Sequence, residues 1–182
     1  ISDIRLYKSL VENIPGNSMP SDFGDRSLNL IERRIAMKLR EQAFSLGEFD
    51  HLYLNFTTCL PDNTILPSKR EADRYHSWYR YYDIGVSQEL FEHLGSSDTV
   101  AVIIALLKQT LLQYFAPDEP ARNIIEAAVE EAVTKGPEML IRFKEKKAAK
   151  TAAVIYLQLL DNAQYQPILS VRDLQGLSLI PT

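Results

Sequence analysis

Residues that build the common cofactor and metal sites are scarce in this chain of 182 residues. No two of its seven glycines lie closer than eight residues, whereas a phosphate-binding loop needs glycines five apart and a dinucleotide-binding turn needs them two and three apart. Three histidines are present, without the His-Glu-x-x-His or paired-cysteine spacing of a zinc site. The sequence therefore predicts no cofactor and no metal site, and it assigns no catalytic residue.

Cysteine and positive charge are also limited. Cys59 is the one cysteine, so no internal disulfide can form, which fits a reducing compartment. Twenty basic against 24 acidic residues give a net charge of −4, and this balance disfavours nucleic acid, whose phosphate backbone normally requires a basic face. The first twenty residues have four charged side chains and no long apolar core, unlike a signal peptide. We therefore expect a cytoplasmic protein with no membrane partner.

Hydrophobic periodicity predicts three long helices. Apolar residues recur at spacings of three and four over 25–47, with charged residues between them, as in an amphipathic helix. The segment 100–115 is apolar on nearly every side, which is typical of a helix covered on both sides, and we expect Leu107 and its neighbours to be buried. A third helix follows an aspartate cap over 118–136, and a short one lies at 87–95.

Alternation of apolar and polar residues predicts several strands. The two clearest lie at 51–60 and 78–86, and two more form a hairpin at 154–160 and 165–171. The segment 137–150 is ambiguous, because its first half alternates like a strand while its Lys- and Ala-rich second half favours helix.

These helices and strands predict a single α+β domain over residues 1–182. We expect a central sheet of four or five mostly antiparallel strands, flanked by three or four helices. No internal repeat, low-complexity segment or long linker divides the chain.

The segment 75–83 is the most unusual local feature. It holds five of the seventeen aromatic residues, directly after several basic residues. Aromatic and arginine side chains together give large contact areas at little entropic cost, as in the hot spots of protein interfaces. Tyr and Trp also favour strands, so ordinary core packing is the main alternative, and stacking on single-stranded nucleic acid is another.

Strand alternation divides this segment between two faces. Trp78 and Tyr82 fall on the face that continues into apolar residues, so we expect both in the core. The opposite face, with Tyr79 and Tyr81, is left for a partner. The sequence predicts these two tyrosines, supported by Arg74 and His76, as the partner-binding residues.

These observations favour a non-catalytic domain that binds another protein. Small size, acidic balance and the lack of a cofactor motif fit a bacterial immunity or antitoxin-like protein that acts by surface occupation. Enzymes also assemble sites from residues distant in sequence, so a hydrolase or transferase is one alternative, with a site around His76, Arg80, Tyr82 and Asp83. An RNA-binding accessory domain is the other.

Overall fold

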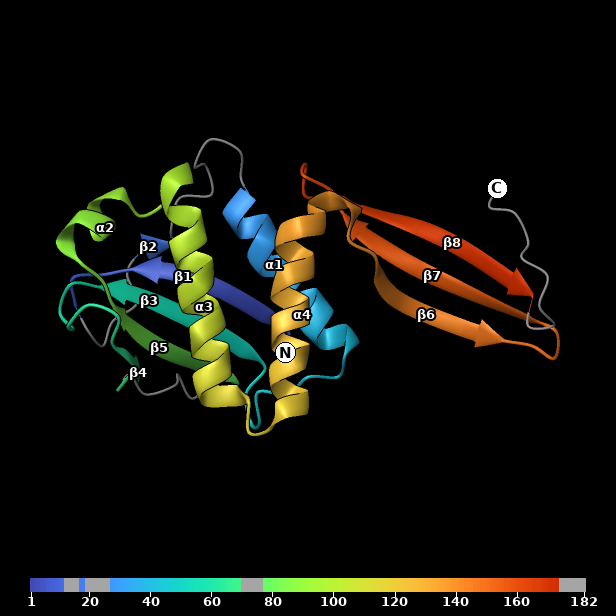
Figure 1. Ribbon diagram of the computed structural model, residues 1–182, viewed down its shortest axis with the longest axis horizontal. Helices are drawn as coiled ribbons and strands as arrows, with labels where there is room; N and C mark the ends of the chain where they lie inside the picture. Colours follow the sequence, from blue (N-terminus) through green and yellow to red (C-terminus); the bar gives the residue numbers. More distant parts are fainter. Residues whose placement is uncertain (12–16, 19–26, 70–76, 174–182) are drawn as a thin grey trace.

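The computed structural model describes residues 1–11, 17–18, 27–69 and 77–173, which form two β-sheets and a layer of helices (Figure 1). The first part contains β1 (Asp3–Lys8), β2 (Asn17–Ser18), α1 (Ser27–Glu41), β3 (His51–Thr57), β4 (Ile65–Pro67) and β5 (Tyr79–Gly85). The helices α2 (Gln88–His93), α3 (Val100–Phe115) and α4 (Glu119–Lys135) follow. The chain ends in β6 (Ile141–Lys147), β7 (Thr151–Leu159) and β8 (Tyr165–Asp173). The predicted mixture of helix and strand is confirmed.

The first sheet has the strand order β2-β1-β3-β5-β4. Its three central strands are parallel, since β1 pairs with β3 and β3 with β5 in this sense, while the short edge strands β2 and β4 pair antiparallel. The prediction of a mostly antiparallel central sheet is therefore wrong, although the sheet has five strands. The physical reason lies in the connections: α1 and the long segment before β5 return the chain to the same end of the sheet, as parallel pairing requires.

One face of the first sheet forms the hydrophobic core together with the helices. Alternate residues of the central strands are buried there: Ile4, Leu6, Leu52, Leu54, Phe56, Tyr82 and Ile84. In Figure 1, α3 and α4 cross this face, and α1 packs beside α4. The period-two patterns predicted for β3 and for the second half of β5 are confirmed, and the described helices supply the core on this one face.

Helix α3 supplies the most apolar part of this core. Ile103, Ile104 and Leu107 are buried, as predicted. Val102 remains 43% exposed, so the helix is covered on one side and the prediction of cover on both sides is wrong. By length and composition alone, Ser97–Phe115 would be long and apolar enough to cross a membrane, but packing of one side into a core accounts for the same composition.

The two sides of α3 give a direct test of the core. We expect Leu107→Ala to lower the free energy of unfolding by about 2–5 kcal/mol, because it leaves a cavity where the side chain is fully buried. Val102→Ala, on the exposed side, should change it by no more than about 0.5 kcal/mol. Urea unfolding of both variants measures the difference, and equal losses would contradict this placement of the helix.

The second sheet is an antiparallel meander in the order β6-β7-β8, and it extends away from the helices in Figure 1. The predicted hairpin is confirmed as β7 and β8, closed by a hydrogen bond from the Leu160 amide to the Gln164 carbonyl (2.9 Å). Within the ambiguous segment 137–150, residues Ile141–Lys147 form β6. Pairing with the β7 strand overrides the helix propensity of the Lys- and Ala-rich half.

Arg34 of α1 joins the helix to the second sheet. Its side chain is buried, and its Nη2 donates to the Leu159 carbonyl at 2.7 Å and to Oδ1 of Asp161 at 2.8 Å. Nε donates to the same carbonyl at 3.2 Å. A buried guanidinium requires such partners, and here they come from the end of β7 and from the hairpin turn.

Two further residues on the same side of α1 continue this contact, at the helical spacing of three and four. Lys38 Nζ lies 2.7 Å from Glu41 and 3.0 Å from Glu131 of α4, and it donates to the Leu140 carbonyl at 3.5 Å. Glu41 accepts a hydrogen bond from the Arg142 amide at 3.0 Å. The charged side of α1 therefore faces the second sheet and α4.

Candidate functional site

The face of the first sheet opposite the helices carries polar and aromatic side chains. The strand register aligns them in three rows across β1, β3 and β5: Asp3, His51 and Tyr79; Arg5, Tyr53 and Tyr81; Tyr7, Asn55 and Asp83. The rows form because paired residues of neighbouring strands point to the same face. Tyr79 and Tyr81, two of the predicted partner-binding residues, therefore lie away from the hydrophobic core.

Five of these side chains form an aromatic cluster, defined as Tyr7, His51, Tyr53, Tyr79 and Tyr81. The ring of Tyr53 is central, with centroid distances of 4.8 Å to Tyr79, 5.2 Å to Tyr81 and 5.6 Å to Tyr7. Burial, together with hydrogen bonding to Tyr79, raises the pKa of the Tyr53 hydroxyl. The other four side chains are partly exposed. The cluster is therefore a packed aromatic surface with one buried member and four accessible ones.

Trp78 lies beside the cluster, with its ring centroid 5.8 Å from that of Tyr79. It is 42% exposed, so the prediction that it belongs to the core is wrong. The residue stands in the turn before β5, where strand alternation does not yet apply. Arg74 and His76, the other two predicted partner-binding residues, lie outside the described residues.

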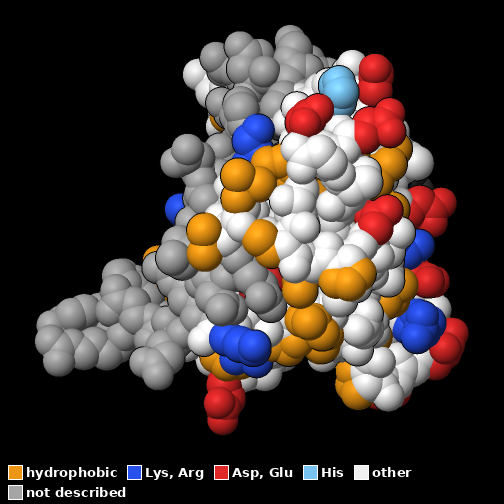
Figure 2. Space-filling view, turned by 90° about the vertical axis from the view of Figure 1, so that its left-hand side faces the viewer, with side chains coloured by type: hydrophobic (Ala, Val, Ile, Leu, Met, Phe, Trp, Pro, Cys, Tyr) orange, Lys and Arg blue, Asp and Glu red, His pale blue; other side chains and the backbone are white. Residues whose placement is uncertain are grey.

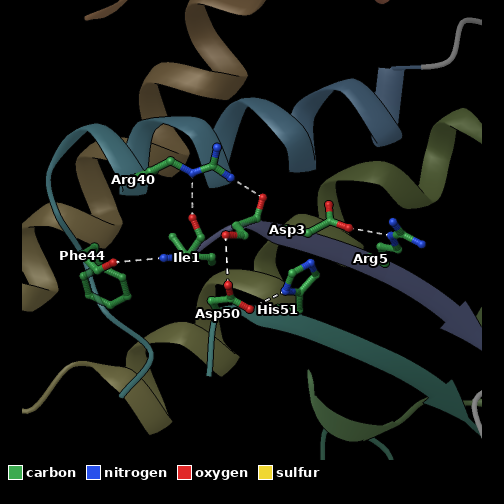
Figure 3. A network of polar contacts seen from close by, with 8 residues as sticks. Ile1, Asp3, Arg5, Arg40, Phe44, Asp50 and His51 are labelled. Atoms are coloured by element: carbon green, nitrogen blue, oxygen red, sulfur yellow. Dashed lines mark hydrogen bonds and ion pairs between the residues drawn. The ribbon is translucent and has the colours of Figure 1, made fainter. Parts of the chain in front are cut away.

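A hydrogen-bonded network borders the cluster at the start of β3 (Figure 3). Arg40 of α1 donates to the Ser2 carbonyl, and the Ser2 hydroxyl donates to Asp50 at 3.2 Å. The other oxygen of Asp50 lies 2.5 Å from Nδ1 of His51. Slight burial acts to raise the pKa of Asp50, but its hydrogen bonds with His51 and Ser2 outweigh this and lower the pKa. The carboxylate therefore orients the imidazole, whose centroid lies 4.9 Å from that of Tyr79.

A carboxylate-oriented imidazole is also the arrangement of many general bases. A nucleophile would then be needed within hydrogen-bonding distance of the ring. Within the part of the chain that the structure describes, no hydroxyl or thiol hydrogen-bonds to His51. The geometry of Asp50 and His51 thus favours a positioning role at the border of the aromatic cluster.

The residues suggested for an enzyme site do not converge. Arg80 and Tyr82 lie on the helix-covered face, with the guanidinium 5.9 Å from the centroid of the Tyr82 ring. Asp83 lies on the opposite face, where it is buried and accepts a hydrogen bond from Asn55 at 2.8 Å. His76 lies outside the described residues. Strand alternation therefore divides the three described side chains between two faces of the sheet.

Glu32 of α1 is a buried carboxyl near the β1 edge of the sheet. The residue is 5% exposed, and its Oε2 has no hydrogen-bond partner among the described residues. Burial, reinforced by the negative charge of Asp3, raises its pKa well above the ordinary value of 4.5, and the charges of Arg5 and Arg33 only partly oppose this. Ionising Glu32 in the folded protein therefore costs stability.

This environment predicts a pH dependence of stability. Because the folded pKa is raised, the unfolded chain releases the Glu32 proton first, so this group lowers stability progressively as the pH rises above about 4.5. Glu32→Gln removes the titration, and its stability should exceed that of the wild type by a margin that grows with pH and then levels off. Denaturant unfolding between pH 4 and 8 measures this margin. Glu48→Gln, at an exposed position, is the control, and the same margin in both variants would contradict the assignment.

Among residues 1–11, 17–18, 27–69 and 77–173, no group of three or more His, Cys, Asp or Glu side chains is placed to hold a metal ion. Figure 2 looks onto the end of the molecule where β1, β3 and β5 finish, and there the hydrophobic side chains lie in separate small groups, with acidic ones gathered along one side. Four surface hollows that described residues line lie at the helices or the second sheet, apart from the aromatic cluster.

Comparison with protein families, with curated proteins and with solved structures gives no match. The candidate site therefore rests on its geometry. The sequence pointed to Tyr79 and Tyr81, but it missed Tyr7, His51 and Tyr53, because only the parallel pairing of three strands brings them together. The one available signal was the alternation along 51–57, which places Tyr53 on the face away from the core.

Proposed function

We propose that this chain is a non-catalytic domain that binds another protein and acts by occupying its surface, with the aromatic cluster at the centre of the contact. The observation that carries this proposal is the packing of the partly exposed Tyr79 and Tyr81 against the buried ring of Tyr53. Rings held in this way lose little conformational entropy on binding and offer a large contact area, as the hot spots of interfaces do.

Arg5 adds a charged group to the same surface. Its guanidinium lies 5.6 Å from the centroid of the Tyr53 ring, and its Nε donates to Asp3 at 2.6 Å. The side chain is nevertheless 57% exposed. Tyrosine and arginine side chains are enriched together at protein interfaces, which supports a partner contact across this row of the sheet. The sequence also assigns Arg74 and His76, which lie outside the described residues, to partner binding.

The distribution of charge supports a basic partner. Outside residues 141–173 the chain has 14 basic and 21 acidic side chains, a net charge of −7. An excess of negative charge of this kind accelerates encounter with a positively charged protein. It fits a bacterial immunity or antitoxin-like protein that blocks a basic partner, and it disfavours the RNA-binding alternative.

Replacing both accessible tyrosines tests this function. Tyr79→Ala/Tyr81→Ala should weaken binding of the partner by about 2 kcal/mol or more, because hot-spot aromatics are removed. It should also cost some stability, since each ring packs on Tyr53 and such pairs contribute about 0.5–1.5 kcal/mol. The partner is captured from cells that make the protein, identified by mass spectrometry, and titrated by calorimetry below the melting temperature of every variant.

The matched control is Tyr156→Ala/Ile168→Ala, a cross-strand pair on the second sheet. It removes similar apolar area far from the aromatic cluster and should leave the affinity unchanged. A partner that binds the folded tyrosine variant as tightly as the wild type would place the contact elsewhere on the molecule.

A further inference from the structure

The second sheet has one face that is apolar and exposed over its outer part. Its register places Ile155 beside Leu169 and Ala153 beside Val171, and Leu157 continues the same face toward α1. We name these five residues the apolar strip. Leu169 is 61% exposed and Val171 42%, although a sheet normally buries its apolar face against another layer.

Two lysines of β6 border the apolar strip. Lys144 pairs with Ile155 and Lys146 with Ala153, so both share the face of the strip. Neither has an acidic partner within the described residues. Glu145 is on the opposite face, where it lies 3.2 Å from Arg172 and 3.7 Å from Lys147.

The charge of this sheet is opposite to that of the rest of the chain. Residues 141–173 have six basic and three acidic side chains, a net charge of +3, against −7 for the remainder. The strip is thus apolar along β7 and β8 and positive along β6. This pattern is complementary to a partner that combines apolar and acidic side chains.

A hollow of about 530 Å³ lies where the strip meets α1. Phe143, which is 66% exposed, and Tyr165 line it together with Met37 and Leu157. Arg33 fixes the Tyr165 side chain at this hollow by donating a hydrogen bond to the Tyr165 hydroxyl at 3.1 Å. Three charged residues, Arg40, Glu41 and Arg142, line another part of the hollow. Its apolar part lies beside the exposed apolar strip and suits the anchoring side chain of a docked segment.

We propose that the apolar strip and this hollow bind an amphipathic helix of a partner protein, with acidic residues along one flank of the helix. Its apolar stripe would cover the strip and fill the hollow, as α1, α3 and α4 cover the first sheet, and its acidic flank would lie beside Lys144 and Lys146. A nucleic acid fits less well, because its phosphate backbone presents no apolar side chains to cover the strip.

The test uses the full chain and two synthetic helical peptides of about 18 residues, long enough to hold a helix in part. Both have the same leucine stripe, flanked by glutamates in one and by lysines in the other. In an NMR titration of the isotope-labelled protein, the glutamate peptide should shift amide signals of β7 and β8. It should bind at least about tenfold more tightly than the lysine peptide.

Charge reversal sharpens this test. Lys144→Glu/Lys146→Glu should abolish or reverse the preference for the glutamate peptide. The matched control Lys147→Glu/Lys150→Glu makes the same change in net charge on the other face of β6 and in the following turn, and should retain the preference. Tyr79→Ala/Tyr81→Ala should also retain it, so this proposal and the proposed function fail separately.

Several results would overturn the proposal. Equal affinity for the two peptides, or amide shifts outside the second sheet, would remove its basis. A dimer in sedimentation that Leu169→Glu disrupts would make a second copy the occupant. Peptide binding that appears only after deletion of residues 174–182 would make the chain's own end the occupant. Binding to phosphatidylserine vesicles, with the same lysine dependence and no peptide binding, would identify a membrane surface.

Discussion

The Arg34 guanidinium fixes the relative position of the two sheets. It lies in the middle of α1, buried, and its donors are used by the Leu159 carbonyl and by Asp161 at the start of the hairpin turn. On its other side α1 packs into the core of the first sheet through Ile35 and Leu39. A buried arginine that loses its partners is costly, so the second sheet cannot leave α1 without leaving an unpaired charge. The position of the second sheet and its apolar strip relative to α1 therefore depends on this contact.

Much of the fold follows from local pattern, because helix and strand periods depend on neighbours along the chain. The long helices, β3 and the hairpin of β7 and β8 were predictable for that reason. The parallel pairing of β1, β3 and β5 was not predictable from local pattern, because parallel strands are joined through long connecting segments. The sequence pattern predicts that the charged residues of α1 form the polar side of an amphipathic helix. Arg34 and Glu32 are in fact buried, and burial of a charge depends on tertiary partners that a pattern of residue types does not contain.

In the candidate site, too, local pattern predicts some residues and tertiary contacts determine the others. Alternation assigned Tyr79 and Tyr81 to the face opposite the core, and this holds because both lie inside β5. It failed for Trp78, one residue before the strand, where the turn sets the direction of the side chain. Tyr53 and His51 join the cluster through strand register alone. The aromatic cluster on the first sheet and the apolar strip on the basic second sheet are two chemically distinct surfaces.

Hydrogen exchange of Arg34→Met, followed by mass spectrometry, tests the central role of that contact most directly. Methionine has a similar length and is neutral, so the carbonyl of Leu159 and the carboxylate of Asp161 lose their donor while the packing volume remains. We expect faster exchange at the ends of β7 and β8 that meet α1, with unchanged protection in β3 and β5. Unchanged exchange throughout the hairpin would show that apolar packing alone holds the second sheet, and would contradict the account.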